Sequence, residues 1–314
     1  MASQTLSNLP IIDFTMENLK PDTNSWLSAR SDVRRAIKEY GSFIALYDKV
    51  SAELNNEVFN KLKELFDLPT KTKSQNWSDK VYYGYVGQLA HLPIHESLAI
   101  ADANTLDGVQ SFTNLMWPSG NDNFCENMLK YGKKVAEQEQ LVSKMVVESY
   151  GLERYYNSHL HSMTYFLRTI KYREPEIDET NAGTDIHTEK SLITILHQNQ
   201  VHGLQIQARN GNWIDVDFTL ESFVIIAGDA SLAWSNDRIH SPRHQVILRE
   251  KKTRYTIGVF AYNMGTTDIP QEMVDDEHPL QFRSFDNMGL LQSYFDNPTC
   301  LTGETAWSYC GIRA

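Results

Sequence analysis

The chain has 314 residues, of which 41% are hydrophobic and 22% are charged, and its formal net charge is -11 at pH 7. This is the composition of an ordinary globular protein with enough apolar side chains for a sizeable core, and one large β-rich domain can reach this length. The excess of acidic residues argues against nucleic acid or an anionic membrane surface as a partner, because both carry negative charge themselves.

The three cysteines are Cys125, Cys300 and Cys310. Their odd number and wide spacing form neither a disulfide framework nor a zinc-binding motif, which is typical of a reducing compartment. The first residues lack a basic flank followed by an apolar segment, and the apolar runs are too short to cross a bilayer. We therefore expect a cytoplasmic protein that makes no use of a membrane.

The first half of the chain is expected to be rich in helices, with a little sheet. Short apolar runs at 9–14 and 42–47 predict strands. Apolar side chains recur at helical spacing over three further segments, and Ser51 is a suitable N-cap for the second of them. These predicted helices cover 26–40 up to Gly41, 51–66 before Pro69, and 121–150 before Gly151.

The second half has the pattern of a β-sandwich or barrel. Short strand-like runs alternate with Gly, Asn, Asp and Pro turns, and the NGNW sequence at 210–213 is a strong hairpin signal. A last short helix is expected near 288–296. The predicted strands are 161–174, 191–197, 202–208, 213–216, 222–227, 243–249 and 253–263.

These elements predict one folding unit with three regions. Residues 1–120 form a helix-rich N-terminal region, and 121–265 form a β-rich catalytic core with a long preceding helix. Residues 266–314 form a C-terminal helical tail. The expected fold class is mainly β with flanking helices.

His187 and Glu189 stand two residues apart, and His244 lies on a later predicted strand. On a strand, or just past its end, residues i and i+2 point to the same side, so both side chains can reach one ion. Two imidazoles and one carboxylate on one face of an octahedron leave positions for a keto acid and O₂, as Fe(II) oxygenases require. The spacing alone is also common on protein surfaces, so the neighbouring motifs must decide.

Arg254 and Thr256 alternate on the predicted strand that follows His244. A guanidinium and a hydroxyl on one strand face suit a carboxylate, and Tyr172 offers a further phenolic donor. An arginine inside the apolar run TRYTIGVFAY needs a partner, because a buried charge is costly. A dicarboxylate meets that need.

Motifs along nearly the whole chain resemble plant 2-oxoglutarate- and Fe(II)-dependent dioxygenases. The resemblance implies a double-stranded β-helix, or jelly-roll, fold. It also implies that His187, Glu189 and His244 bind Fe(II), while Arg254, Thr256 and Tyr172 bind 2-oxoglutarate, with O₂ as the second co-substrate. The segments are LPIIDF, YGSFIAL, FDLPTKTK, HTEKSLITILHQNQVHGLQIQ, SNDRIHSPRHQV and RYTIGVF.

Four shorter segments resemble one branch of this family more narrowly, namely the dioxygenases that modify glucosinolate side chains and hydroxylate steroidal glycoalkaloids. They are KYREPE, HSPRHQV, VDDEHPLQF and SYCGI. The branch implies a specialised plant metabolite as substrate, for which we favour a steroidal alkaloid-like scaffold over a sulfur-containing side chain. Hydroxylation is the expected outcome, with desaturation or ring closure left open. We expect a monomer with a small-molecule substrate.

Two positions depart from the family pattern. Glu189 stands where aspartate is usual, and its added methylene moves the carboxylate by roughly 1.5 Å. This change can weaken iron binding or redirect the oxidation to another C–H bond. Thr256 stands where serine is common and keeps the hydroxyl.

The substrate contacts are expected among aromatic residues. Phe260 and Tyr262 are favoured, because they follow Arg254 and Thr256 along the same strand, and Phe112 and Trp117 are further candidates. Core packing is the alternative role for each. The wider set of candidates comprises Tyr82, Tyr83, Tyr85 and Trp234.

Other polar residues are expected to have structural roles. His240 precedes His244 by four residues, too far along a strand to share its ion. His197 and His202 flank a predicted hairpin and are interpreted as structural, and Asp229 as a turn residue.

Two other functions remain open. Two histidines, a glutamate and a water also make a zinc hydrolase site, although this reading gives no role to Arg254 and Thr256. Alternatively, the chain is a catalytically impaired homologue that binds a small molecule without turnover, with Glu189 as the lesion.

Overall fold

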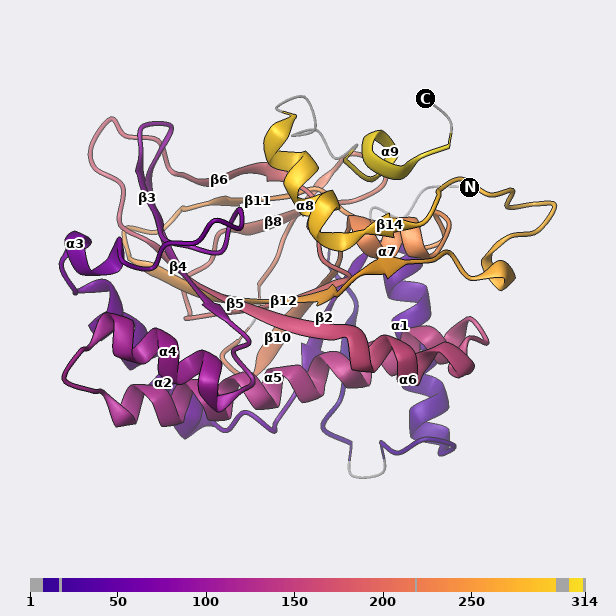
Figure 1. The fold of residues 1–314 in the computed structure, drawn as a ribbon, viewed down its shortest axis with the longest axis horizontal. Helices are drawn as coiled ribbons and strands as arrows, with labels where there is room; N and C mark the ends of the chain where they lie inside the picture. The colour runs from indigo at the N-terminus through magenta and orange to yellow at the C-terminus, as the bar shows by residue number, and fades with distance from the viewer. Residues whose placement is uncertain (1–7, 17–18, 218, 298–304, 313–314) are drawn as a thin grey trace.

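Two β-sheets face each other at the centre of the computed structural model, which describes residues 8–16, 19–217, 219–297 and 305–312 (Figure 1). The larger sheet has eight strands in the order β1-β2-β10-β7-β12-β5-β4-β3. Its members are β1 (Ile11–Asp13), β2 (Ser42–Leu46), β3 (Val86–Leu89), β4 (Leu92–Ala101), β5 (Met163–Tyr172), β7 (Ile193–Gln198), β10 (Ser222–Ala227) and β12 (Arg254–Asn263).

The smaller sheet has four strands in the order β6-β11-β8-β9. Together the two sheets form the expected jelly-roll core, and the chain is mainly β with flanking helices, as predicted. The members of the smaller sheet are β6 (Ala182–His187), β8 (Leu204–Gln207), β9 (Trp213–Asp215) and β11 (His244–Ile247), and a separate short ladder joins β13 (Thr266–Thr267) to β14 (Phe285–Asp286).

Helices cover the outer face of the larger sheet, below it in Figure 1, while α8 lies across the opposite side. The long helix α5 contacts α1, α2, α4 and α6 as well as strands β7 and β12. The helices are α1 (Asn24–Glu39), α2 (Ala52–Phe66), α3 (Thr70–Lys73), α4 (Leu106–Met116), α5 (Asp122–Ser149), α6 (Glu153–Ser162), α7 (Asp229–Trp234), α8 (Asn287–Asp296) and α9 (Thr305–Cys310), with a 3-10 turn at Gln271–Met273.

The main hydrophobic core lies between the larger sheet and these helices. It draws Trp26 from α1, Val135 from α5, Ile257 from β12 and Ala306 from α9 into one buried cluster. The three regions expected from the sequence therefore share one core. Burial of this apolar surface is the main stabilising contribution, because it removes the surface from water.

Gly41 shows how the N-terminal part is fitted to the catalytic strands. Its φ of 67° lies in the left-handed region, as expected for the residue that ends α1. A Cβ on Gly41 would lie 2.3 Å from the carbonyl oxygen of His240. The backbone N–H of His240 donates to the carbonyl oxygen of Ile37 at 3.1 Å. The segment that leads to His244 therefore packs directly against the end of α1.

The predicted helices and strands are confirmed within a few residues, including the Ser51 cap and the β8–β9 hairpin at NGNW. The first half is rich in helices with a little sheet, as predicted, but strands β3 and β4 were missed, and β4 is a long strand paired with β5. The sequence of β4, LPIHESLAIA, contains proline and glutamate, which are uncommon in strands, so it does not show a clear strand pattern. Helices α4 and α6 and strand β6 were also missed, and residues 161–162 end α6 instead of beginning β5.

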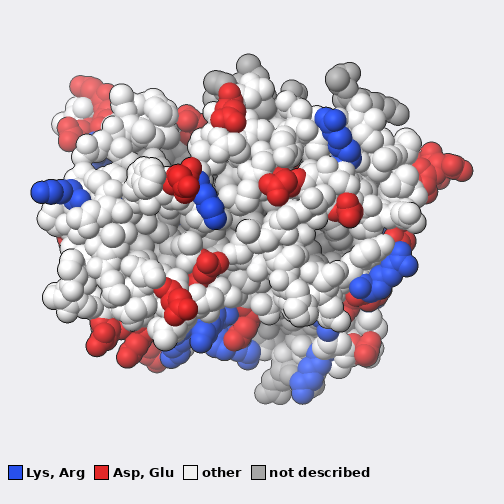
Figure 2. Space-filling model, in the orientation of Figure 1, with Lys and Arg blue, Asp and Glu red and all other residues white. Residues whose placement is uncertain are grey.

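Acidic and basic side chains are interspersed over the face of the molecule drawn in Figure 2. Among the described residues, the structure has no helix of the length and hydropathy that a bilayer crossing requires.

Candidate metal centre

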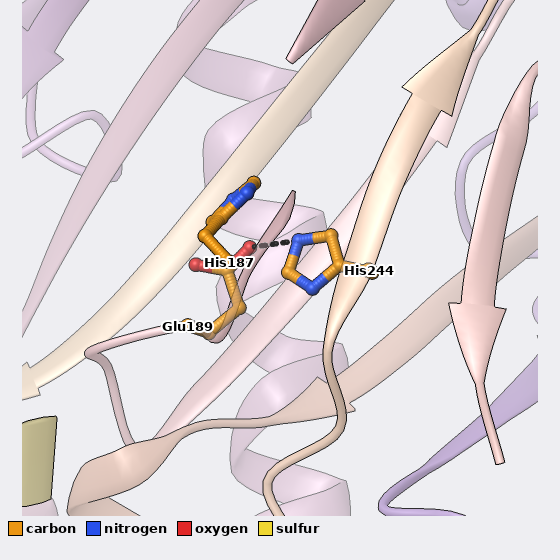
Figure 3. A group of neighbouring side chains, drawn as sticks. All are labelled: His187, Glu189 and His244. Carbon is orange, nitrogen blue, oxygen red and sulfur yellow. Dashed lines mark ion pairs between the residues drawn. The ribbon is translucent and has the colours of Figure 1, made fainter. Parts of the chain in front are cut away.

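His187, Glu189 and His244 converge on one point between the two sheets (Figure 3). His187 ends β6 and His244 begins β11, and these two residues are direct partners in the antiparallel register of the smaller sheet. Glu189 follows in the loop after β6. One potential ligand atom from each residue lies within 4.8 Å of the others, and His244 Nε2 is 3.2 Å from Glu189 Oε1. Sheet pairing thus brings together three residues that are far apart in the chain.

The ring nitrogens of the two histidines are arranged for metal binding. His187 Nδ1 lies 2.8 Å from the carbonyl oxygen of Asp185, and His244 Nδ1 lies 3.5 Å from that of Pro242. A carbonyl oxygen can only accept a hydrogen bond, so each ring carries a proton on Nδ1. This leaves Nε2 as the ligand atom, oriented by the backbone as is usual for metal-binding histidines.

The electrostatics favour the protonation states that bind a divalent ion. Burial, together with the neighbouring His244, lowers the pKa of His187 to about 3, so this imidazole is neutral at physiological pH. Burial opposes ionisation of Glu189, but the hydrogen bond and charge of His244 outweigh it, and the pKa of Glu189 lies below its ordinary value. Two imidazole nitrogens and a carboxylate are a donor set for Fe(II) that leaves coordination positions open.

A candidate binding site for a carboxylate, also buried, lies beside this cluster. Arg254 is 0% exposed, and its Nε and Nη2 donate to Gln198 Oε1 at 2.9 Å and 2.7 Å. Within the part of the chain that the structure describes, Arg254 Nη1 and Thr256 Oγ1 are buried without a hydrogen-bond partner. Buried polar groups without partners are energetically costly. An anion bound here would give the Arg254 guanidinium and the Thr256 hydroxyl the partner that they lack. The distal carboxylate of 2-oxoglutarate fits this need.

Sequence reasoning missed Gln198. Gln198 of β7 lies directly opposite Thr256 of β12, two residues along the strand from Arg254. Its amide oxygen accepts the two hydrogen bonds that hold the Arg254 guanidinium in place. A polar residue at the end of the apolar run 191–198, before a strand that begins with arginine, was the available signal.

A cavity of about 430 Å³ joins the metal cluster to the carboxylate site. Phe260 and Tyr262 line it, because Arg254, Thr256, Phe260 and Tyr262 all point to the same face of β12. The structure thus places the two favoured aromatic residues beside the candidate metal ligands and beside all three of the candidate 2-oxoglutarate residues, since Tyr172 also lines the cavity.

The prediction that Phe112 and Trp117 contact the substrate is not supported, because neither residue lines this cavity. Both pack against Phe124 of α5, with ring centroids 5.9 Å and 4.6 Å away. Helix α4 lies against α5 in the layer that covers the larger sheet, so these two aromatic residues serve core packing. From the wider set, Tyr82 lines the cavity, whereas Trp234 is buried in the main core.

Helix α8 supplies a wall of the cavity that was not predicted from the sequence. Leu291, Tyr294 and Phe295 line the cavity together with Lys190 and His95. The helix itself was predicted near 288–296, and its Tyr-Phe pair was the only hint of a role at the site.

Among the residues expected to be structural, His197 is fully buried in the core, and His240 precedes β11 outside any strand. Asp229 has the structural role expected of it, but it lies in a helix and not in a turn. It begins α7, is 1% exposed, and accepts hydrogen bonds from the hydroxyl groups of Thr188 and Ser241.

Comparison with known proteins agrees with this geometry. Residues 153–262 match the family model of the 2OG-Fe(II) oxygenase superfamily, and residues 9–119 match that of the non-haem dioxygenase in morphine synthesis N-terminal region. The "Probable 2-oxoglutarate-dependent dioxygenase AOP1" of Arabidopsis thaliana is 41% identical over 293 residues, which is 91% of this chain and 96% of that protein. The 2-oxoglutarate-dependent dioxygenase AOP3 of the same plant is 30% identical, over 98% of both chains.

The crystal structure of the dioxygenase for auxin oxidation in rice has a TM-score of 0.81 and 24% identity, and the match covers 96% of this chain and 100% of that one. At this level of identity, the similarity is evidence for the fold alone. Three observations lead to the same family. They are the converging side chains of His187, Glu189 and His244, the buried arginine with an unpartnered N–H group, and the matches along most of the chain. This chain belongs to the 2OG-Fe(II) oxygenase superfamily and is a 2-oxoglutarate-dependent dioxygenase that uses Fe(II).

Proposed function

We propose that this enzyme hydroxylates a largely apolar specialised plant metabolite, with a steroidal alkaloid-like scaffold as the favoured class. The observation that carries the proposal is the single cavity that contains the metal ligands, the unpartnered Arg254 N–H group and an apolar, aromatic wall. Such a wall excludes water and selects substrates by shape more than by charge.

The residues have separate tasks in this reaction. His187, Glu189 and His244 hold Fe(II), which when bound supplies the oxygen-activating chemistry. Arg254 and Thr256 bind the distal carboxylate of 2-oxoglutarate, and Gln198 keeps the guanidinium in its orientation.

Tyr172 remains a neutral phenol that can donate to the same carboxylate. It is 2% exposed, and burial raises its pKa to about 12. Its ring makes an edge-on contact with the ring of His95, with the two centroids 5.4 Å apart, and Nε2 of His95 lies 3.0 Å from Ser97 Oγ.

The preference for a substrate without a negative charge follows from the partners of the basic side chains around the cavity. Arg254 is used by the co-substrate, and the ammonium of Lys190 is paired with Asp229 at 3.0 Å. His91, at the margin of the cavity, lies 3.5 Å from Asp185. These contacts leave little to stabilise a substrate carboxylate, whereas the aromatic side chains suit an apolar ring system.

The test is to incubate the purified protein with Fe(II), 2-oxoglutarate and a plant extract, and to follow mass gains of one oxygen by mass spectrometry. Succinate should appear in proportion to the oxidised product, and the Glu189→Ala variant should give neither. Fractionating the extract into acidic, neutral and basic pools tests the substrate class. Product that forms only from the acidic pool would contradict the preference for an uncharged or basic scaffold.

The alternative is a homologue that binds a small molecule without turnover. Anaerobic addition of Fe(II) and 2-oxoglutarate distinguishes the two, because a functional centre gives a weak visible charge-transfer band. Absence of this band in the folded protein would favour the non-catalytic homologue or a zinc site.

A further inference from the structure

Lys190, the residue after Glu189, is a buried ammonium that joins the ligand loop to the wall of the cavity. Its side chain is 4% exposed. Its Nζ donates to the carbonyl oxygen and to the hydroxyl of Thr188, both at 2.7 Å, and lies 3.0 Å from Asp229 Oδ2. Because an ammonium has three N–H donors, these contacts occupy all of them. Lys190 therefore has no donor to offer a substrate.

Asp229, the partner of Lys190, connects the two segments that carry the metal ligands. Its Oδ2 accepts from the Thr188 hydroxyl at 2.9 Å, and its backbone N–H donates to the carbonyl oxygen of Glu189 at 2.7 Å. Its Oδ1 accepts from the hydroxyl of Ser241 at 2.7 Å, on the segment that enters β11 at His244. One buried carboxylate thus links the Glu189 loop to the approach to His244.

The ligand loop has little freedom to move toward α7. A Cβ on Gly228 would lie 2.2 Å from the carbonyl oxygen of Ser191 and 2.9 Å from that of Glu189, so the two backbones are in direct contact. Ser231 Oγ donates to the carbonyl oxygen of Leu192 at 2.7 Å. The Lys190 side chain lies on the side of the loop that lines the cavity.

The aromatic ring of Tyr294 covers that side. Its centroid lies 4.5 Å from Lys190 Nζ, within the range of a cation–π interaction. Tyr294 belongs to α8 and also lines the cavity, so the ammonium lies between the ligand loop and the wall formed by this helix.

We propose that Lys190 is a positioning residue that, through its pair with Asp229, fixes the Glu189 carboxylate in its binding position. Through Tyr294, it also makes metal affinity depend on the placement of α8. The physical basis is that a buried ion pair with satisfied hydrogen bonds holds a specific geometry, and residues that orient metal ligands affect affinity without touching the ion. The inference rests on the metal centre of the proposed function.

The test measures the Kd of Mn(II) for the full chain, in the presence of 2-oxoglutarate, by isothermal titration calorimetry. Lys190→Met alone leaves a buried unpaired carboxylate and risks unfolding, so the principal variant is Lys190→Met/Asp229→Asn, which removes both charges. We expect its Kd to rise by about ten-fold. Tyr294→Leu should raise the Kd by about two- to five-fold, whereas Tyr294→Phe, which keeps the ring, should match the wild type.

A matched control is Lys134→Met/Glu137→Gln, which removes an exposed ion pair of α5 with an N–O distance of 2.9 Å and should leave the Kd unchanged. Circular dichroism confirms that each variant is folded. Wild-type affinity in the folded Lys190→Met/Asp229→Asn variant would overturn the inference while leaving the metal centre intact. Equal losses in Tyr294→Phe and Tyr294→Leu would overturn the role of the ring. Failure of the wild type to bind Mn(II) would overturn the metal centre itself.

Discussion

Arg254 of β12 and Tyr172 of β5 are directly opposed in the register of the larger sheet, with the guanidinium carbon 5.1 Å from the centre of the phenol ring. The ring covers one face of the cation, and Gln198 occupies two of its nitrogens. Among the described residues, the buried Nη1 has no hydrogen-bond partner, so it is available to a carboxylate of the co-substrate. This cross-strand pair is the structural basis of the predicted carboxylate site.

Arg254→Lys should raise the KM for 2-oxoglutarate by about 10- to 100-fold, because a lysine cannot reproduce the planar fork that binds a carboxylate. Tyr172→Phe should raise it by less, about two- to ten-fold, since it removes one hydrogen bond. The measurement is succinate formation against 2-oxoglutarate concentration. Arg249→Lys, in an exposed pair with Asp215, is the control. An unchanged KM in Arg254→Lys contradicts the assignment.

Glu189→Ala should abolish succinate production, because it removes the only carboxylate of the three-residue cluster. Glu189→Asp should keep it, since the shorter side chain still offers an anionic oxygen and matches the residue usual in the family. Succinate and oxidised product are measured together by liquid chromatography and mass spectrometry. Full activity in both variants would show that this carboxylate does not bind the metal.

Phe112→Ala should lower the stability to unfolding by about 3–5 kcal/mol, because it opens a cavity in the core between α4 and α5. It should leave the pattern of oxidised products unchanged. Phe260→Leu, in the cavity wall, should change that pattern with a smaller loss of stability. Urea unfolding and product analysis of the two variants separate the roles, and a changed product pattern in Phe112→Ala would return that residue to the substrate site.

Stability should fall as the pH is lowered from about 6.5 to about 4. Burial lowers the pKa of His197 to about 4, and the ring lies between the Tyr131 hydroxyl at 3.0 Å and the Leu220 carbonyl oxygen at 2.9 Å. In the unfolded chain this imidazole takes up a proton near its ordinary pKa of 6.5, so acid favours unfolding, by at most about 3 kcal/mol for this residue. Below pH 4 both states are protonated and this contribution no longer changes.

His197→Gln isolates this effect. The amide keeps a donor for the Leu220 carbonyl oxygen but does not titrate, so the variant should be less stable than the wild type at pH 7.5. The difference in urea midpoint should shrink as the pH falls toward 4. Parallel curves for the two proteins would show that His197 is not the titrating group.

The sequence alone determined the residue types and their order. The HTE triplet, the later histidine and the arginine inside an apolar strand indicated a metal and a dicarboxylate, and the family resemblance of motifs along the chain made this assignment specific. The periodicity of 26–40 and 121–150 likewise predicted helices. These signals depend on neighbours in the chain, which a single sequence contains.

Only the tertiary structure decided which side chains share a cavity. Phe112 and Phe260 are both buried aromatic residues, yet Phe112 packs on α5 and Phe260 lines the cavity that contains the candidate metal ligands. Gln198, Asp229 and Tyr294 act through partners on other elements, so their local sequence gives only a weak signal of these roles. Contacts between distant segments depend on sheet register and helix packing, and these are set by burial of the whole core and not by any short stretch of the chain.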